Sequence, residues 1–164
     1  MLPFLVTLFE HKAWCNQGLL RALEGVPKDS DRRQMAVILL TFEHTALVDQ
    51  VFKARLGGAD HNFTAVVGTR VPDLDQLAAT MRETDAWYLD YVRNIPLAAL
   101  DEVVTFTFTD GDEGRLTRGQ ILAHIVTHGA SHRGAIGKML ETLGVPGASD
   151  MVTTFQREAQ SHRI

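Results

Sequence analysis

Three histidines lie four residues apart in the C-terminal half of the sequence, at His124, His128 and His132. In an α-helix, neighbours at this spacing differ by only about 40° around the axis, so all three would project from one face. Neutral imidazole is a common metal ligand, and two imidazoles one turn apart can close on a single ion. The spacing therefore indicates a divalent-metal site on this stretch.

His44 occupies a comparable position in an earlier helical stretch, between Leu40 and Leu47 of its apolar seam. His128 and His132 likewise replace apolar residues in their own seam. Burying imidazoles costs free energy unless their nitrogens find partners, and one ion shared by two facing helices would satisfy all three rings. We therefore predict that His44, His128 and His132 bind one metal ion.

The sequence leaves other interpretations of the histidines open. Each could be a core histidine that hydrogen-bonds a carbonyl or a hydroxyl group. His124 is a further candidate ligand, or a residue of a pocket wall or of the surroundings of the metal. His11, on the first predicted helix, is a less favoured candidate ligand.

Two metal chemistries do not fit the residues around these histidines. A zinc protease needs Glu directly after the first histidine of the pair, where this chain has Gly129. Di-iron helical proteins need Glu-x-x-His motifs, whereas Glu10-His11 and Glu43-His44 are adjacent pairs on different helix faces.

Helical periodicity and end signals predict where the positioning elements lie. Ser30 or Asp31 is expected to cap the second helix and Asp73 the third, and Pro96 ends the third. Alternation in Val104–Thr109 predicts a strand, followed by a turn at 110–114 and a short return strand at 115–117. The predicted helices span residues 2–24, 31–56, 73–95, 117–143 and, for a shorter one, 149–161. We predict one all-α domain over residues 1–164: a four-helix bundle with a small β-hairpin before the last long helix and a short C-terminal helix.

Three further residues are assigned roles from their positions. Asn16 lies in the seam of the first helix and is expected to be a buried polar contact near the site. Arg133 should point away from the metal face into a salt bridge or an interface. Gly134, inside a predicted helix, suggests close approach of another helix or of a ligand.

Composition excludes several classes of protein. The formal net charge is −4 and there is no run of Lys or Arg, so nucleic-acid binding is not expected. Cys15 is the single cysteine, which rules out an intrachain disulfide and fits a cytoplasmic setting. No uninterrupted apolar run is as long as a membrane span, so no membrane association is expected.

The stretch His124-Ile-Val-Thr-His128-Gly-Ala-Ser-His132-Arg133-Gly134 resembles the signature helix of the DinB/YfiT-like superfamily. An upstream helical His44 and a strand-like insert before the last long helix agree with this resemblance. Further agreement comes from residues of the first helix: Trp14, Asn16, Leu19 and Leu20. The similarity extends over nearly the whole chain.

The resemblance implies a four-helix bundle in up-down-down-up order, often dimeric, with zinc or nickel held by His44, His128 and His132. It also implies a thiol-dependent transferase, or an isomerase that uses a low-molecular-weight thiol. Gly129 and Ala135 depart from the family pattern, because relatives often carry polar residues there. A catalytic base at either position is therefore not expected.

The favoured function is a metal-dependent enzyme in which a divalent ion bound by three histidines activates a thiol or water, as a thiol-dependent transferase or a hydrolase. Its expected partners are a small-molecule substrate, with a low-molecular-weight thiol as one candidate, and a second copy in a homodimer. One alternative is a metal-binding or ligand-binding helical module without catalysis. Another is a metal-free dimeric interaction domain. No catalytic residue besides the ligands is assigned.

Overall fold

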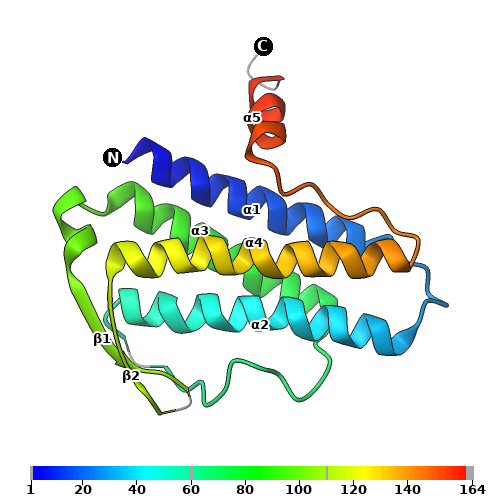
Figure 1. The fold of residues 1–164 in the computed structure, drawn as a ribbon, viewed down its shortest axis with the longest axis horizontal. Helices are drawn as coiled ribbons and strands as arrows, with labels where there is room; N and C mark the ends of the chain where they lie inside the picture. Colours follow the sequence, from blue (N-terminus) through cyan, green and yellow to red (C-terminus); the bar gives the residue numbers. More distant parts are fainter. Residues whose placement is uncertain (1, 60, 110, 162–164) are drawn as a thin grey trace.

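The computed structural model describes residues 2–59, 61–109 and 111–161. Figure 1 shows long helices lying together, with a small hairpin at one end and a short helix near the C-terminus. The elements in chain order are α1 (Pro3–Glu24), α2 (Arg32–Leu56), α3 (Leu74–Asn94), the 3-10 helix η1 (Leu97–Asp101), β1 (Val103–Thr107), β2 (Glu113–Thr117), α4 (Arg118–Thr142) and α5 (Val152–Ser161). The predicted set of helices and the hairpin are thereby confirmed.

The predicted helix starts depend on side-chain caps that the structure contains. Asp31 accepts from the backbone amides of Arg33 and Gln34, and Asp73 accepts from that of Gln76. Thr117 and Gln120 form a reciprocal capping box at the start of α4. Some details differ from expectation: α5 begins at Val152 rather than near 149, and η1 was not predicted. The first strand ends at Thr107 rather than Thr109, and the return strand begins at Glu113, inside the predicted turn.

The hairpin packs against α2 through Phe106. β1 and β2 are antiparallel, with Val104 opposite Leu116, and the Phe106 ring meets the Phe52 ring edge-on at 5.5 Å. Such a small ribbon is stable only when it leans on other elements, and this contact supplies that support. Part of the predicted turn, at residue 110, lies outside the described residues.

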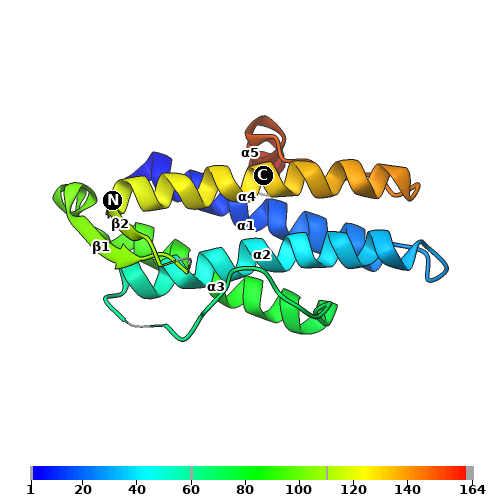
Figure 2. The same ribbon diagram turned by 60° about the horizontal axis from the view of Figure 1, so that its bottom comes forward.

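The four long helices lie side by side in both views (Figures 1 and 2). α1 packs against α3 and α4, and α2 packs against the same two helices. In Figure 1, α1 and α4 run from left to right, whereas α2 and α3 run in the opposite direction. The α2–α4 contact is the one that brings the predicted ligands within reach of one another.

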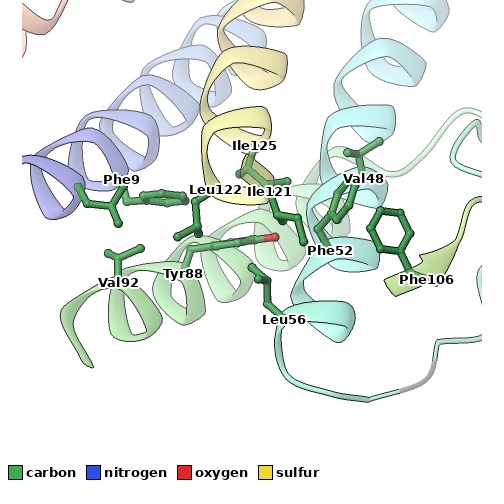
Figure 3. Packing of buried hydrophobic residues seen from close by; sticks show 11 residues of the cluster. Phe9, Val48, Phe52, Leu56, Tyr88, Val92, Phe106, Ile121, Leu122 and Ile125 are labelled. Carbon is green, nitrogen blue, oxygen red and sulfur yellow. The ribbon is translucent and has the colours of Figure 1, made fainter. Parts of the chain in front are cut away.

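The buried apolar residues form two clusters, one at each end of the long helices. The cluster beside the hairpin combines the beginnings of α1 and α4 with the ends of α2 and α3 (Figure 3). Tyr88 and Phe9 stack there with ring centroids 5.4 Å apart. The other cluster combines the opposite halves, including Leu20, Phe42 and Ile136.

Between these clusters lies a group of buried polar side chains that we call the polar layer: Lys12, Asn16, Asp49, Asp85 and Arg133. Lys12 Nζ lies 2.7 Å from Asp49 Oδ2 and 2.6 Å from Asp85 Oδ1. Asn16 donates to Asp85 through Nδ2 at 2.9 Å and accepts from Arg133 through Oδ1 at 3.0 Å. Each of the four long helices therefore contributes to one connected network.

The charges of the polar layer depend on one another. Burial by itself would lower the pKa of Lys12, but the carboxylates of Asp49 and Asp85 reverse this effect and raise it. Burial raises the pKa of Asp49, whose Oδ1 atom is buried without a hydrogen-bond partner. Lys12 is the cation that compensates both carboxylates, so the layer depends on it.

Two glycines of α4 meet different surroundings. A Cβ atom on Gly129 would lie 2.9 Å from Arg133 Nη1, so this glycine leaves room for the guanidinium of the polar layer. Gly129 therefore faces the interior network and not the predicted ligands. A Cβ atom on Gly134 would have no neighbour within 4 Å, so the expected close approach of a helix or ligand there is wrong.

α2 is the one helix among the described residues whose length and composition would allow it to cross a membrane. An 18-residue stretch of α2 has a high mean hydropathy and few charged residues, and this is why the helix qualifies. The expectation from the sequence concerned only uninterrupted apolar runs. The core helix of a water-exposed domain passes the same test, and nearly half of that window is buried inside the protein. The finding does not point to a membrane protein.

Replacement of Lys12 by Met tests the polar layer. The change removes the shared cation while keeping a side chain of similar length, and it leaves two buried carboxylates uncompensated. We expect the free energy of unfolding to fall by about 3–5 kcal/mol, measured by urea denaturation. Lys138→Met on the surface of α4 is the control and should leave the transition midpoint nearly unchanged. Equal effects of the two changes would contradict the role given to Lys12.

Alanine substitutions at Gly129 and Gly134 form a second, matched test within one helix. Both gain about 1 kcal/mol of helix propensity, but only Gly129→Ala displaces the Arg133 guanidinium from its charge-assisted hydrogen bonds. We expect Gly134→Ala to raise the thermal midpoint. Gly129→Ala should lower the thermal midpoint, because its net effect is to reduce the free energy of unfolding by about 1 kcal/mol. A gain at both positions would show that Arg133 is not held as the structure places it.

Candidate metal centre

The structure brings His44, His128 and His132 together across the contact between α2 and α4. Each offers a ring nitrogen, and these nitrogens all lie within 4.8 Å of one another. The His44 ring centroid is 5.0 Å from that of His128 and 4.9 Å from that of His132. All three side chains are half-buried, so the cluster is shielded yet reachable from solvent. We call these residues the three-histidine cluster.

The backbone of the α2–α3 connection orients His44. His44 Nδ1 lies 2.7 Å from the carbonyl oxygen of Val66, which can only accept a hydrogen bond. A hydrogen bond to this oxygen requires a proton on Nδ1, and it leaves Nε2 as the ring nitrogen that faces α4. Carbonyl groups that hold a metal-binding histidine in this way are a regular feature of metal sites.

The arrangement of His44 and His128 fits two ligands of one ion. Their Nε2 atoms are 3.1 Å apart, close to the separation of about 3.3 Å expected for two nitrogens on a tetrahedral zinc ion. Among the described side chains, His128 Nδ1 is a buried nitrogen without a hydrogen-bond partner. This nitrogen is not the one that faces His44, so the fit to an ion rests on the Nε2 separation and on the donor set of three imidazoles.

The electrostatics of the cluster favour neutral imidazoles. Burial, with smaller contributions from His132, His124 and His44, lowers the pKa of His128 to about 4. Burial, followed by the proximity of His44, also lowers the pKa of His132. Neutral rings are the form that binds metal, so these two residues need not lose a proton near neutral pH.

His124 lies beside the cluster but outside it. Its ring stacks on His128 with centroids 5.1 Å apart, and it meets Phe52 edge-on at 5.4 Å. It also lines a cavity of about 250 Å³ with Phe106, Phe108 and Val66. The structure thus agrees with the pocket-wall interpretation of His124 and does not place it among the converging nitrogens.

The other residues with a role predicted from the sequence lie outside the three-histidine cluster. His11 lies on α1 beside Cys15 and Asp150, away from the three-histidine cluster. Asn16 is buried in the polar layer, as expected of a polar seam residue. Arg133 forms a salt bridge with Asp150 at 2.8 Å, which confirms the salt-bridge expectation, and its side chain is buried.

Sequence reasoning missed the contribution of Val66. A backbone carbonyl in a connecting segment leaves no signal in residue type, because every residue has one. The apolar character of Val66 and of the hairpin phenylalanines was visible, but the cavity that they form with His124 depends on how the hairpin leans on α2.

Comparison with known proteins gives two findings. The model of the DinB family matches residues 1–163. Protein DinB of Bacillus subtilis (strain 168) is 24% identical over 162 residues, which cover 90% of this chain and 91% of that relative.

Elemental analysis of a matched pair of variants tests the geometry of the cluster. His44→Ala removes the ring that Val66 orients, whereas His124→Ala removes the neighbouring ring outside the converging group. After incubation with Zn²⁺ and dialysis, we expect His44→Ala to carry about one equivalent less metal than the native chain, and His124→Ala to match it. Identical metal contents for all three proteins would mean that the histidines are ordinary core residues.

Proposed function

The chain belongs to the DinB family, and we propose that it is a metal-dependent enzyme whose three-histidine cluster activates a thiol or a water molecule. The observation that carries the proposal is the convergence of three imidazole nitrogens from two facing helices, with His44 oriented by the carbonyl group of Val66. Zinc and nickel are the ions that we favour, because imidazole suits both.

Three protein ligands favour a reactive site over a structural one. Structural zinc sites are closed by four protein ligands, whereas catalytic sites keep a position open for water or substrate. The half-buried state of the cluster is consistent with such access. A divalent ion held by His44, His128 and His132 would lower the pKa of a water or thiol bound beside it.

The cavity next to His124 suggests where the other substrate binds. Its walls are mainly aromatic and aliphatic side chains from α2, the hairpin and the α2–α3 connection. Val66 connects the cavity with the three-histidine cluster, because its carbonyl group orients His44 and Val66 also lines the cavity. We infer that the cavity holds the apolar part of an electrophile and excludes water from it, while the nucleophile binds at the cluster.

Thiol transfer is the reaction that we favour over hydrolysis. The resemblance stated from the signature helix implies a thiol-dependent transferase or isomerase, and an apolar cavity suits an uncharged electrophile. A low-molecular-weight thiol is then the expected second substrate.

The remaining architecture is interpreted in the same way. We interpret the four long helices as a single-domain bundle in up-down-down-up order, supported by their pairings and directions. A homodimer is proposed from the family resemblance, and a cytoplasmic setting is proposed from the single cysteine.

The rival proposal is a metal-binding or ligand-binding module without catalysis. Melting curves with and without a chelator separate the two, because an ion that holds the fold together stabilises it strongly. We expect only a small shift in the melting temperature, since the two apolar clusters do not depend on the histidines. A large shift without any turnover would favour the module.

The activity itself is tested by a screen of thiols against small aromatic electrophiles, with the Zn²⁺- or Ni²⁺-loaded protein. We expect thiol consumption that depends on the metal, and a loss of at least about 100-fold in kcat/KM for His44→Ala, because perturbing even the partners of metal ligands costs 10–100-fold. Lys138→Met is the surface control and should keep the native rate. Turnover that survives both chelation and His44→Ala would refute the proposal.

A further inference from the structure

A second group of metal-binding side chains lies on α1, apart from the three-histidine cluster. His11 and Cys15 are one helical turn apart, and His11 Nε2 lies 3.2 Å from Cys15 Sγ. Asp150, in the segment between α4 and α5, places Oδ1 3.1 Å from Cys15 Sγ and 3.8 Å from His11 Nε2. A nitrogen, a sulfur and an oxygen atom, each able to bind a metal ion, therefore converge from two separate parts of the chain.

We propose that His11, Cys15 and Asp150 form a second divalent-metal site, suited to thiophilic ions such as Zn²⁺. Sulfur, nitrogen and oxygen ligands on a tetrahedral zinc ion are separated by about 3.3–3.6 Å. The three separations in the structure, 3.2, 3.1 and 3.8 Å, differ from that range by a few tenths of an ångström. Small side-chain rotations are enough to seat an ion among them.

The alternative is a metal-free contact, a hydrogen-bonded pin, in which the S–H group of Cys15 donates a hydrogen bond to Asp150 and holds the C-terminal segment on α1. A thiol is a weak donor, and here it occupies a buried position that a stronger donor could fill. Burial, with the hydrogen bond to Asp150, raises the pKa of Cys15 to about 12, which excludes a free thiolate nucleophile near neutral pH. Metal binding would replace the S–H bond by a metal–sulfur bond and release the proton to solvent.

Arg133 holds Asp150 in the orientation that the site needs. Arg133 Nε donates to Asp150 Oδ2 at 2.8 Å, and Nη2 lies 3.2 Å from Oδ1. Partners of this kind fix metal-binding carboxylates. With one thiolate, one carboxylate and the Arg133 cation, a divalent ion would leave the group with a net charge of +1, so no large charge imbalance opposes binding.

The site would join the C-terminal segment to α1. Gly147 approaches the backbone of Gly137 in α4, and Phe155 of α5 lies 5.8 Å from both the His11 and Trp14 rings. Trp14 Nε1 also donates to Glu158 at 3.1 Å. An ion bound to Asp150 would therefore strengthen a contact between chain segments that otherwise depends on a few side chains.

Co²⁺ titration of the full-length protein tests this inference separately from the proposed function. A thiolate ligand gives Co²⁺ an intense charge-transfer absorption in the near ultraviolet, which an all-histidine site cannot produce. We expect this band in the native chain and in His44→Ala, and its loss in Cys15→Ser. Zn²⁺ should abolish the band by displacing Co²⁺.

Asp150→Asn provides a second variant that keeps the thiol. We expect it to keep the fold, judged by circular dichroism, and to weaken Co²⁺ binding by at least about 10-fold, read from the same band. If the native chain shows no thiolate band under excess Co²⁺, the three residues are a hydrogen-bonded pin and the inference is overturned. That result would leave the three-histidine cluster untouched, because its metal content is measured through His44→Ala.

Discussion

The double ion pair of Lys12 with Asp49 and Asp85 constrains the rest of the molecule. A buried ammonium group is tolerated only where carboxylates compensate it, so α1, α2 and α3 must bring these side chains to one level. Arg133 and Asn16 connect α4 to the same level. An apolar interior alone would tolerate sliding of one helix along another, whereas this network permits only one axial register. The two apolar clusters on either side supply the bulk of the burial, and the polar layer selects the alignment.

The alignment places α4 between the two groups of side chains for which we propose metal binding. Toward α2, consecutive turns present His128 and His132 to His44. Toward α1, Arg133 extends from the polar layer to Asp150, which lies beside His11 and Cys15. Gly129 makes the second arrangement possible, because the absence of a side chain there leaves room for the Arg133 guanidinium. A shift of α4 by one turn would separate Arg133 from Asn16 and Asp150.

The sequence predicted what depends on neighbours in the chain. The spacing of His128 and His132, the caps at Asp31 and Asp73 and the alternation in the hairpin are local features, and each is present. His44 could be added because a histidine in an apolar seam needs a partner. The buried state of Lys12 was not predicted, because lysine is rarely buried and its compensating carboxylates lie on other helices. The meeting of Cys15 with Asp150 was missed for the same reason, since it depends on the path of the segment after α4.

The residues that stabilise the fold are separate from the three histidines, and this separation favours a reactive role for the three-histidine cluster. In small metal-dependent folds the ion supplies free energy that the core cannot. Here Phe42, Tyr88 and Ile125, each fully buried, belong to apolar clusters that are complete without the histidines. The half-buried rings of His44, His128 and His132 therefore carry little of the folding free energy. Half-buried imidazoles that converge on one another, outside both apolar clusters, are typical of residues kept for binding or catalysis.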